Sequence, residues 1–355
     1  MKTDSKPNIY GYPLPLLRQV LADNKLPKFN ADQIFNWAYR NFKYDPIEWT
    51  NIGKKTLEFI NENFDTSIPK IVWNGLSKDG TRKFLLAMND GKTVEAVAIP
   101  ARDRLTLCIS SQVGCAIGCT FCHTGTMGLT RHLQGGEIVG QYLAVQKFLH
   151  EKDEPRLSNI VYMGQGEPLH NFDNVKASAE VFIEPKGLGL SQRKVTLSTS
   201  GLIPAIERLM EFPPINIAIS LHAAHDDIRT ELMPINKRYD LTKLFEAIKL
   251  IPLKAHRRIT YEYILIKELN DRPEDVDALV KLLPKKESKI NIIPFNEYPE
   301  SKFKQPTNET IKWFMDELNR RGIVTTVRAA KGDDILAACG QLKSHAETGK
   351  LNLWE

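Results

Sequence analysis

After Arg102 the sequence alternates regularly between short β-branched runs and amphipathic segments, and this alternation restricts the fold more than any other feature. Runs typical of strands lie near residues 104–110, 158–163, 194–199, 215–220, 258–265 and 289–294. Segments with helical length and spacing lie near residues 136–150, 172–184, 203–211, 240–250, 273–283 and 308–321. Six such units predict an α/β fold with a parallel sheet, which right-handed crossovers shape into either a partial barrel or a wound sheet.

The chain before this alternation divides into two parts. Apolar residues recur at helical spacing in residues 14–21, 31–40 and 54–64, which predicts a small helical domain with Asn30 as a helix cap. Composition shifts near Pro69, and strands are predicted near residues 70–73, 82–87 and 93–100. The expected parts are a helical accessory domain, a β extension, an α/β domain and a tail, at residues 1–65, 66–102, 103–345 and 346–355.

Composition places the chain among ordinary globular proteins. With 355 residues and 42% hydrophobic content it can bury a large core. No apolar run approaches the roughly 20 residues that a membrane helix needs, and the first ten residues lack the apolar centre of a signal peptide. The odd number of cysteines, three of them clustered, suits a reducing compartment. We therefore expect a cytoplasmic protein without a membrane partner.

The net charge of +5 discriminates little between a nucleic-acid-binding protein and a mildly basic enzyme. Basic pairs recur mostly at the ends of predicted elements, where they can contact phosphates or simply be solvated. These pairs are Lys54-Lys55, Arg193-Lys194, Lys237-Arg238, Arg257-Arg258, Lys285-Lys286 and Arg320-Arg321. In the helical domain, Trp37, Tyr39 and Arg40 suit either a nucleic-acid-binding surface or a hydrophobic core.

Three of the five cysteines lie within eight residues, at Cys115, Cys119 and Cys122. Thiolates are soft ligands that suit zinc or iron and sulfide, and Gly114 and Gly118 permit tight turns around them. A structural zinc site normally has four ligands in two separated pairs, and no second pair lies at that distance. His123 is a possible fourth ligand, but a side chain adjacent to a ligand usually points away from the ligand's pocket. Three thiols instead suit a four-iron cluster with one iron open to a substrate.

Polar residues follow successive predicted strands at one edge of the sheet, where parallel α/β folds bind ligands. Gly166 and Glu167 follow the second strand, and this carboxylate can bind an ammonium group. The segments 197–201, 219–223 and 294–296 bring hydroxyl, imidazole and amide groups to the ends of three further strands. Each is compatible alone with a cap or a turn, but together they predict a site for a ribose and an adenine.

Two cysteines remain outside the cluster. Cys108 lies within the first strand, where a packing role is the default for a buried free cysteine. Cys339 lies in the glycine-flanked segment 333–342, where small neighbours favour an accessible, reactive thiol.

The CxxxCxxC spacing resembles the signature of the radical S-adenosylmethionine (SAM) superfamily, in which SAM chelates the open iron. Further stretches are similar to one narrow group: CAIGCTFCHTGTMGLTRHL, MGQGEPLHNFDN, KVTLSTSG, AISLHAAHDDIRTELMPIN, NIIPFN and VRAAKGDDILAACGQL. They resemble the radical SAM ribosomal RNA adenine methyltransferases, in particular the housekeeping branch that methylates adenine C2 in 23S ribosomal RNA and in transfer RNA. The resemblance extends from the N-terminal helices through Leu342.

The resemblance implies a partial (β/α)6 barrel with an N-terminal RNA-binding domain, a [4Fe–4S] cluster, two SAM molecules per turnover and an external electron donor such as flavodoxin. It implies no DNA partner. The cluster ligands carry over as Cys115, Cys119 and Cys122, and the SAM contacts as Gly166, Glu167, Ser198, Ser220, Leu221, His222 and Asn296. Cys339 is implied as the S-methylated residue, Cys108 as the thiol that later forms a disulfide with it, and Glu95 as a proton acceptor.

The sequence departs from the group's usual pattern at three positions: His123 replaces alanine, Thr126 replaces glutamine and Gln165 replaces methionine. None of them removes an implied ligand. Three rival interpretations stay open from the sequence: the resistance branch that methylates adenine C8, a radical SAM enzyme with another substrate, and a zinc-stabilised RNA-binding protein.

Overall fold

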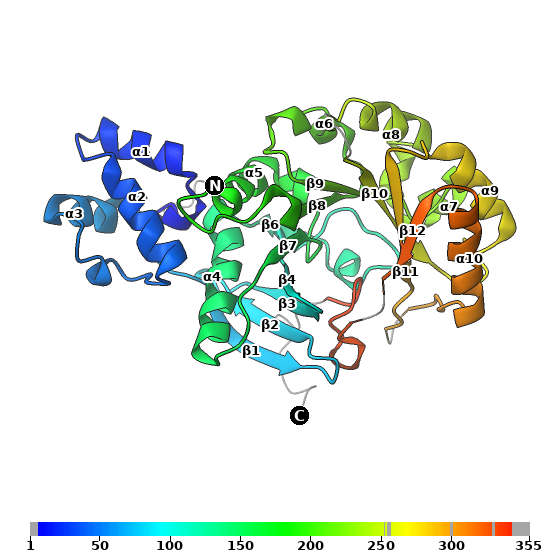
Figure 1. Ribbon diagram of the computed structural model, residues 1–355, viewed down its shortest axis with the longest axis horizontal. Helices are drawn as coiled ribbons and strands as arrows, with labels where there is room; N and C mark the ends of the chain where they lie inside the picture. The colour runs from blue at the N-terminus through cyan, green and yellow to red at the C-terminus, as the bar shows by residue number, and fades with distance from the viewer. Residues whose placement is uncertain (1–5, 252, 254–256, 299–300, 329–330, 343–355) are drawn as a thin grey trace.

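The computed structural model describes residues 6–251, 253, 257–298, 301–328 and 331–342 (Figure 1). Its main element is a ten-stranded sheet in the order β1-β2-β3-β4-β7-β8-β9-β10-β11-β12. Neighbours from β4 to β12 pair in parallel, whereas those from β1 to β4 pair antiparallel. The strands are β1 (Lys70–Leu76), β2 (Arg82–Ala87), β3 (Thr93–Ala101), β4 (Arg104–Cys108), β7 (Asn159–Tyr162), β8 (Val195–Thr199), β9 (Asn216–Ser220), β10 (Ile259–Leu265), β11 (Ser288–Pro294) and β12 (Val324–Val327).

Helices connect the parallel strands and cover the outer face of the curved sheet, while the cysteine loop lies on its inner side (Figure 1). They are α4 (Gly135–Glu151), α5 (Phe172–Ile183), α6 (Ile203–Ile206), α7 (Asp226–Leu232), α8 (Leu241–Ile248), α9 (Pro273–Leu282) and α10 (Asn308–Arg320). All six predicted strands of the α/β domain are present, which confirms the partial barrel. The helix predicted over 203–211 is divided into α6 and a short 3-10 turn at Leu209–Glu211.

Three elements of the barrel were not predicted. Strand β12 adds a seventh parallel strand, but its four residues are too few for a clear alternating pattern. Helix α7 lies within the stretch AISLHAAHDDIRTELMPIN, which was interpreted only for its predicted SAM contacts. The hairpin of β5 (Gln112–Gly114) and β6 (Leu129–His132) frames the cysteine loop. Short elements of this kind depend on tertiary partners rather than on their own periodicity.

The β extension continues the barrel sheet, because β3 pairs antiparallel with β4. In this register Val97 lies opposite Cys108, and Cys108 lies opposite Val161 of β7. Alternate residues of a strand share a face, so Glu95 and Val97 lie on the same side of β3. The pairing therefore brings Glu95 to the neighbourhood of Cys108, which the spacing of these residues did not reveal.

The N-terminal part of the chain forms α1 (Leu14–Asp23), α2 (Phe29–Phe35) and α3 (Lys54–Asn63), close to the predicted helices. The helix predicted over 31–40 ends as an α-helix at Phe35 and continues as a π-helical turn over Asn36–Arg40. The N-terminal part packs against the start of α4 through a glycine contact, since a Cβ atom at Gly11 would lie 2.3 Å from the nitrogen of Gly136. Tyr39 is buried and its hydroxyl donates to the carbonyl of Tyr10 at 3.0 Å. Tyr39 is therefore a core residue rather than a surface for nucleic acid.

The prediction that Asn30 caps a helix is wrong. Helix α2 begins at Phe29, and Asn30 is buried inside its first turn. The Asn30 amide donates to Gln33 Oε1 at 2.5 Å, and its oxygen accepts from the Thr56 hydroxyl at 2.9 Å. These side-chain partners, one of them on α3, replace the backbone N–H groups that a capping residue would bind.

None of the helices in the described ranges combines the length and apolar character needed to cross a bilayer. The predicted tail at residues 346–355 lies outside the described residues.

Candidate active site

The cysteine loop begins after β4 and is shaped by left-handed glycines. Gly114 and Gly118 have φ angles of 76° and 69°, as expected for turns that exclude other residues. A Cβ atom at Gly114 would lie 1.9 Å from the carbonyl oxygen of Gly128, so only glycine fits between β5 and β6. The Cys115 N–H donates to this same carbonyl at 2.8 Å. The loop is thus closed at its base by the hairpin.

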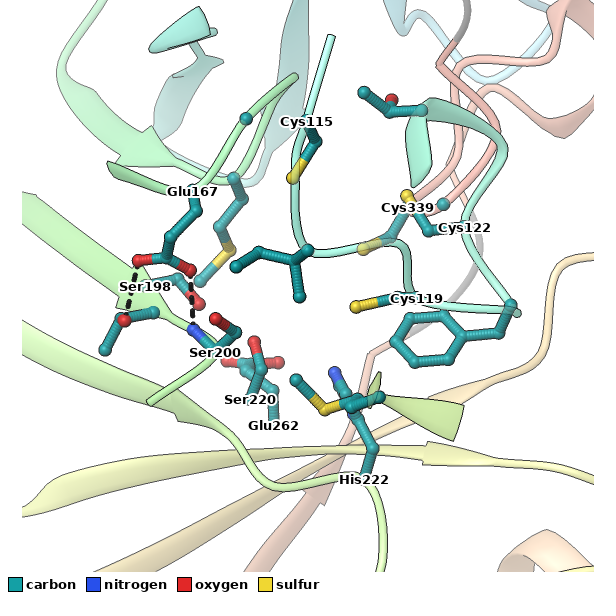
Figure 2. Close-up of a pocket in the computed structure, with 18 of the residues that line it drawn as sticks. Cys115, Cys119, Cys122, Glu167, Ser198, Ser200, Ser220, His222, Glu262 and Cys339 are labelled. Carbon is teal, nitrogen blue, oxygen red and sulfur yellow. Dashed lines mark hydrogen bonds between the residues drawn. The ribbon is translucent and has the colours of Figure 1, made fainter. Parts of the chain in front are cut away.

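The three thiols of this loop line one cavity at the carboxyl ends of the strands (Figure 2). The empty volume is about 920 Å³, which includes space open to solvent and lies within the usual range for ligand pockets. Burial raises the pKa of Cys115 to about 12 and raises the pKa values of Cys119 and Cys122 as well. A metal must therefore displace protons from these thiols when it binds.

This donor set fits the implied four-iron cluster. Three soft donors on one loop face one cavity, and such a cluster keeps one iron open when only three cysteines bind it. Within the described ranges, no three His, Cys, Asp or Glu side chains are grouped as a site for a single metal ion. His123 is buried and its ring stacks on Tyr298 with centroids 4.8 Å apart. It does not belong to the described lining of the cavity.

Glu167 presents a buried carboxylate to the same cavity (Figure 2). It accepts hydrogen bonds from the Thr199 hydroxyl at 2.7 Å, the Leu169 N–H at 3.0 Å and the Ser200 N–H at 2.7 Å. In the described part of the chain no lysine or arginine forms an ion pair with it, and burial raises the pKa of Glu167. A buried carboxylate held by neutral donors is suited to a cationic ligand group, such as the ammonium of SAM.

We expect Glu167→Gln to weaken SAM binding by about 10- to 100-fold, because it removes a charge-assisted hydrogen bond. Isothermal titration measures this effect, with Glu180→Gln on the outer helix α5 as the control. In the wild type the ionised form of Glu167 is lost as pH falls through its raised pKa. SAM affinity should therefore decline on acidification at a higher pH than an ordinary carboxyl group predicts. Unchanged affinity in Glu167→Gln would remove Glu167 from the SAM site.

Most of the other predicted SAM contacts surround this carboxylate. Ser198, Ser220, His222 and Gly166 line the cavity, whereas Leu221 and Asn296 are not among its described lining residues. Burial lowers the pKa of His222 to about 3, so its ring is neutral near pH 7. His222 Nδ1 accepts the Ile264 N–H at 3.0 Å, which leaves Nε2 as the ring donor. The assignment of these residues to SAM stays a prediction.

Thr199, Ser200 and Glu262 also line the cavity, although sequence reasoning did not select them. Ser200 lies two residues beyond Ser198, in a motif already noted. Glu262 lies in the middle of β10, where a strand-end argument does not apply, and its carboxylate accepts from Asn291 Nδ2 at 2.8 Å. Parallel pairing places Glu262 opposite Ser220, the last residue of β9, so this position in β10 is level with a strand end that lines the cavity.

Arg229 is a further residue that the sequence did not indicate. Its guanidinium is buried and donates to the carbonyls of Leu221 at 3.1 Å and Ser200 at 2.8 Å, and to Asn236 Oδ1 at 2.7 Å. Burial lowers the pKa of Arg229 to about 10, so it remains charged at neutral pH. Arg229 therefore ties together the ends of β8 and β9, which carry the predicted SAM contacts.

The segment that carries Cys339 docks against the cysteine loop. The His123 N–H donates to the Gly340 carbonyl at 2.7 Å, and the Thr124 hydroxyl donates to the Leu342 carbonyl at 2.6 Å. Asn296 Nδ2 donates to the carbonyl of Cys339 at 3.1 Å. Cys339 itself is half-buried and lines the cavity that contains the three cluster thiols. The Cys339 thiol is therefore accessible from this cavity.

Cys108 lies beside this docked segment. It is buried in a small apolar cluster with Val97, Ala337 and Leu342, the last two from the segment of Cys339. Both cysteines are free thiols, and burial raises the pKa of Cys108 to about 12. The structure therefore brings together the two cysteines that were assigned linked roles, although their reaction with each other stays a prediction.

Glu95 and the β extension also hold the Cys339 segment. The buried Lys83 ammonium lies 2.8 Å from Glu95 Oε1 and donates to the carbonyl of Leu336 at 3.1 Å. Gln165, one of the departures from the usual pattern, accepts the Glu95 N–H at 3.1 Å through Oε1. Glu95 is absent from the described lining of the main cavity. Its predicted role as proton acceptor stays a prediction.

Comparisons with known proteins agree with this architecture. The family model of the radical SAM superfamily matches residues 109–283. Two proteins named dual-specificity RNA methyltransferase RlmN, from Syntrophotalea carbinolica and Dinoroseobacter shibae, are 45% and 42% identical, with 97% of this chain and 91% of each relative covered. A radical SAM methyltransferase from Sphaerobacter thermophilus has a crystal structure that aligns with a TM-score of 0.88 and 39% identity, covering 95% of this chain and 99% of that one. The chain therefore belongs to the RlmN family of dual-specificity RNA methyltransferases within the radical SAM superfamily.

Proposed function

We propose that this protein methylates C2 of adenine in 23S ribosomal RNA and in transfer RNA through a methyl group carried on Cys339. The observation that carries the proposal is the meeting of Cys108 with the Cys339 segment beside a cavity lined by three further thiols. A single-step methyl transfer would not require a pair of thiols there. Family membership supports RNA as the substrate and a [4Fe–4S] cluster with SAM as the cofactors.

A radical is needed because adenine C2 is an electron-poor carbon without a lone pair, so it cannot attack the methyl group of SAM directly. When bound, the cluster and SAM supply a carbon radical that abstracts hydrogen atoms. We assign cluster binding to Cys115, Cys119 and Cys122, and the orientation of SAM to Glu167 and the other predicted contacts. The neutral His222 ring adds a donor from the opposite wall.

Cys339 carries the methyl group, which loses a hydrogen atom and forms a carbon–carbon bond to C2. The C2 hydrogen leaves as a proton, for which Glu95 is the assigned acceptor. Cys108 then attacks the sulfur of Cys339, so that the carbon–sulfur bond breaks and a sulfur–sulfur bond forms. The released methyl group takes up a proton, and the single electron supplied at the start leaves from the disulfide. An external donor such as flavodoxin completes the cycle by supplying electrons.

We propose that residues 1–65 form an RNA-binding domain and that the protein works in the cytoplasm without DNA or membrane partners. The exposed Lys54-Lys55 pair begins α3 in this domain. Three other basic pairs, at residues 193–194, 257–258 and 285–286, precede β8, β10 and β11. They lie at the amino ends of parallel strands, opposite the edge that carries the cavity. These three pairs are therefore poor candidates for contacts with RNA at the active site.

Nucleoside mass spectrometry tests the proposed function. Reconstituted protein, SAM and a chemical reductant are incubated with transcripts of 23S ribosomal RNA and transfer RNA, which are then digested. We expect 2-methyladenosine from both RNAs. Formation of 8-methyladenosine would assign the chain to the resistance chemistry, and no methylated adenosine with an intact cluster would contradict the proposal.

A further inference from the structure

A second cavity lies next to Cys339, apart from the main one. It is lined by Ile99, Ile293, Asn296, Arg328, Lys331, Ala337, Ala338 and Cys339, and its empty volume of about 280 Å³ includes space open to solvent. Cys339 and Ile293 line both cavities. Cys339 therefore lies between the main cavity, which is lined by the cluster thiols, and the second cavity, which is lined by the cationic side chains of Arg328 and Lys331.

Arg328 is a charged side chain in this second cavity that the proposed mechanism does not use. It follows β12, and its backbone N–H donates to the carbonyl of Ile292 at 2.8 Å, which anchors it to the sheet. Its Nη1 donates to the sulfur of Met163 at 3.5 Å, a weak acceptor. No carboxylate in the described ranges forms an ion pair with Arg328. A guanidinium has five N–H donors, so several remain for a ligand in the cavity.

The surroundings place this guanidinium beside both reacting thiols. Met163 packs against the apolar cluster that contains Cys108 and lines the main cavity. Burial alone lowers the pKa of Arg328, but its electrostatic interactions with Cys339, Glu262 and Cys108 outweigh burial and raise the pKa above its usual value. Arg328 therefore stays charged. The second cavity also has apolar lining residues such as Ile99 and Ala337, which suit the face of an aromatic ring.

We propose that the target nucleobase binds beside Cys339, where the second cavity adjoins the main one, and that Arg328 donates a hydrogen bond from the second cavity to a ring nitrogen next to the carbon that is methylated. The inference rests on the proposed function. In adenine, C2 lies between N1 and N3, and both nitrogens accept hydrogen bonds in the plane of the ring. Addition of a carbon radical to C2 shifts electron density onto these nitrogens, so a neighbouring cation stabilises the addition step.

The same arrangement discriminates against guanine. Guanine carries an amino group on C2, next to both ring nitrogens, and this group would present donors to the donors of Arg328. Where N1 is the bonded nitrogen, its hydrogen would do so as well. A donor facing a donor in a half-buried site is left without a partner, which disfavours the wrong base. Arg328 thus acts as a specificity-determining residue.

The test combines Arg328→Gln with RNA substrates altered at single atoms. Short RNAs carry adenosine, 1-deazaadenosine or 3-deazaadenosine at the target position, and single-turnover rates and equilibrium RNA affinities are measured for each. On adenosine we expect Arg328→Gln to slow methylation by at least about tenfold, with unchanged SAM affinity and unchanged methylation of Cys339 by mass spectrometry. Arg257→Gln, an arginine before β10 whose guanidinium contacts Asn216, is the matched control.

The informative quantity is the ratio of wild type to Arg328→Gln on each RNA. This ratio should fall close to one on the deaza substrate that lacks the bonded nitrogen, in rate or, where the deaza base reacts slowly, in affinity. A ratio that is the same for all three bases, or no loss on adenosine, would overturn the inference while the proposed function stands. If wild-type protein methylates no adenosine, the proposed function fails and the inference fails with it.

Discussion

Cys339→Ala is expected to form no methyladenosine and no covalent complex with RNA, while it keeps its fold, its cluster and its affinity for SAM. The residue is half-buried in a docked segment that is held by hydrogen bonds to its backbone carbonyls, such as those of Gly340 and Leu342. Loss of one sulfur atom leaves these bonds in place. Methylation, iron content and SAM binding are measured on the same preparation.

Cys108→Ala should behave differently, because the proposed mechanism needs this thiol only to release the product. It should complete the carbon–carbon bond and accumulate protein attached to RNA through Cys339, visible as extra mass that nuclease removes. Cys108 packs against Val97 and Ala337, so its removal costs about 1 kcal/mol of stability, a typical value for a single substitution. Yields are therefore normalised to folded protein by circular dichroism.

The two variants together separate chemistry from packing. If methylation in both falls only in proportion to folded protein, the two cysteines are packing residues and the thioether mechanism is wrong for this chain. Cys339 also lines the cavity of the cluster thiols, so iron retained in Cys339→Ala excludes it as a fourth cluster ligand. Loss of iron from Cys339→Ala would instead indicate that Cys339 is a cluster ligand.

Replacing Cys115, Cys119 or Cys122 by alanine is expected to remove both the cluster and SAM cleavage. A cluster left with two protein ligands loses the support that three cysteines provide, and SAM then has no iron to chelate. Iron and sulfide content, visible absorption under anaerobic conditions and 5′-deoxyadenosine formation are the measurements. Cys108→Ala is the matched control, since it also removes one buried thiol but not one of the loop.

Iron at wild-type stoichiometry in any of the three loop variants would contradict the cluster assignment. A colourless wild-type protein that carries one zinc after anaerobic purification would contradict it as well. The raised pKa values of these thiols add a pH dependence, because cluster assembly must displace their protons. Reconstitution should therefore be slower as pH decreases.

The sequence alone predicted those parts of the site whose residues lie close together along the chain. The three thiols share one loop and its glycines, so their spacing alone brought them together. Gly166 and Glu167 follow one predicted parallel strand and Ser198 lies at the end of another, and the rule that such strand ends meet at one edge predicted that they line the same cavity. The helices of the N-terminal domain and the six barrel strands were also predicted, because their periodic patterns extend over several turns or residue pairs.

Tertiary structure alone decided which distant residues meet. Contacts between β3, β4 and the segment of Cys339 place Cys108 against Ala337, and no spacing along the chain encodes that distance. Arg229 and Arg328 escaped sequence reasoning because each acts through carbonyls and cavity walls from separate elements, and an isolated arginine carries no periodic signal. Glu262 is in the interior of a strand, and only its pairing with Ser220 at the end of β9 brings it level with the ligand cavity. These placements follow from packing between elements, which is cooperative over the whole barrel and leaves no signature in any short stretch of sequence.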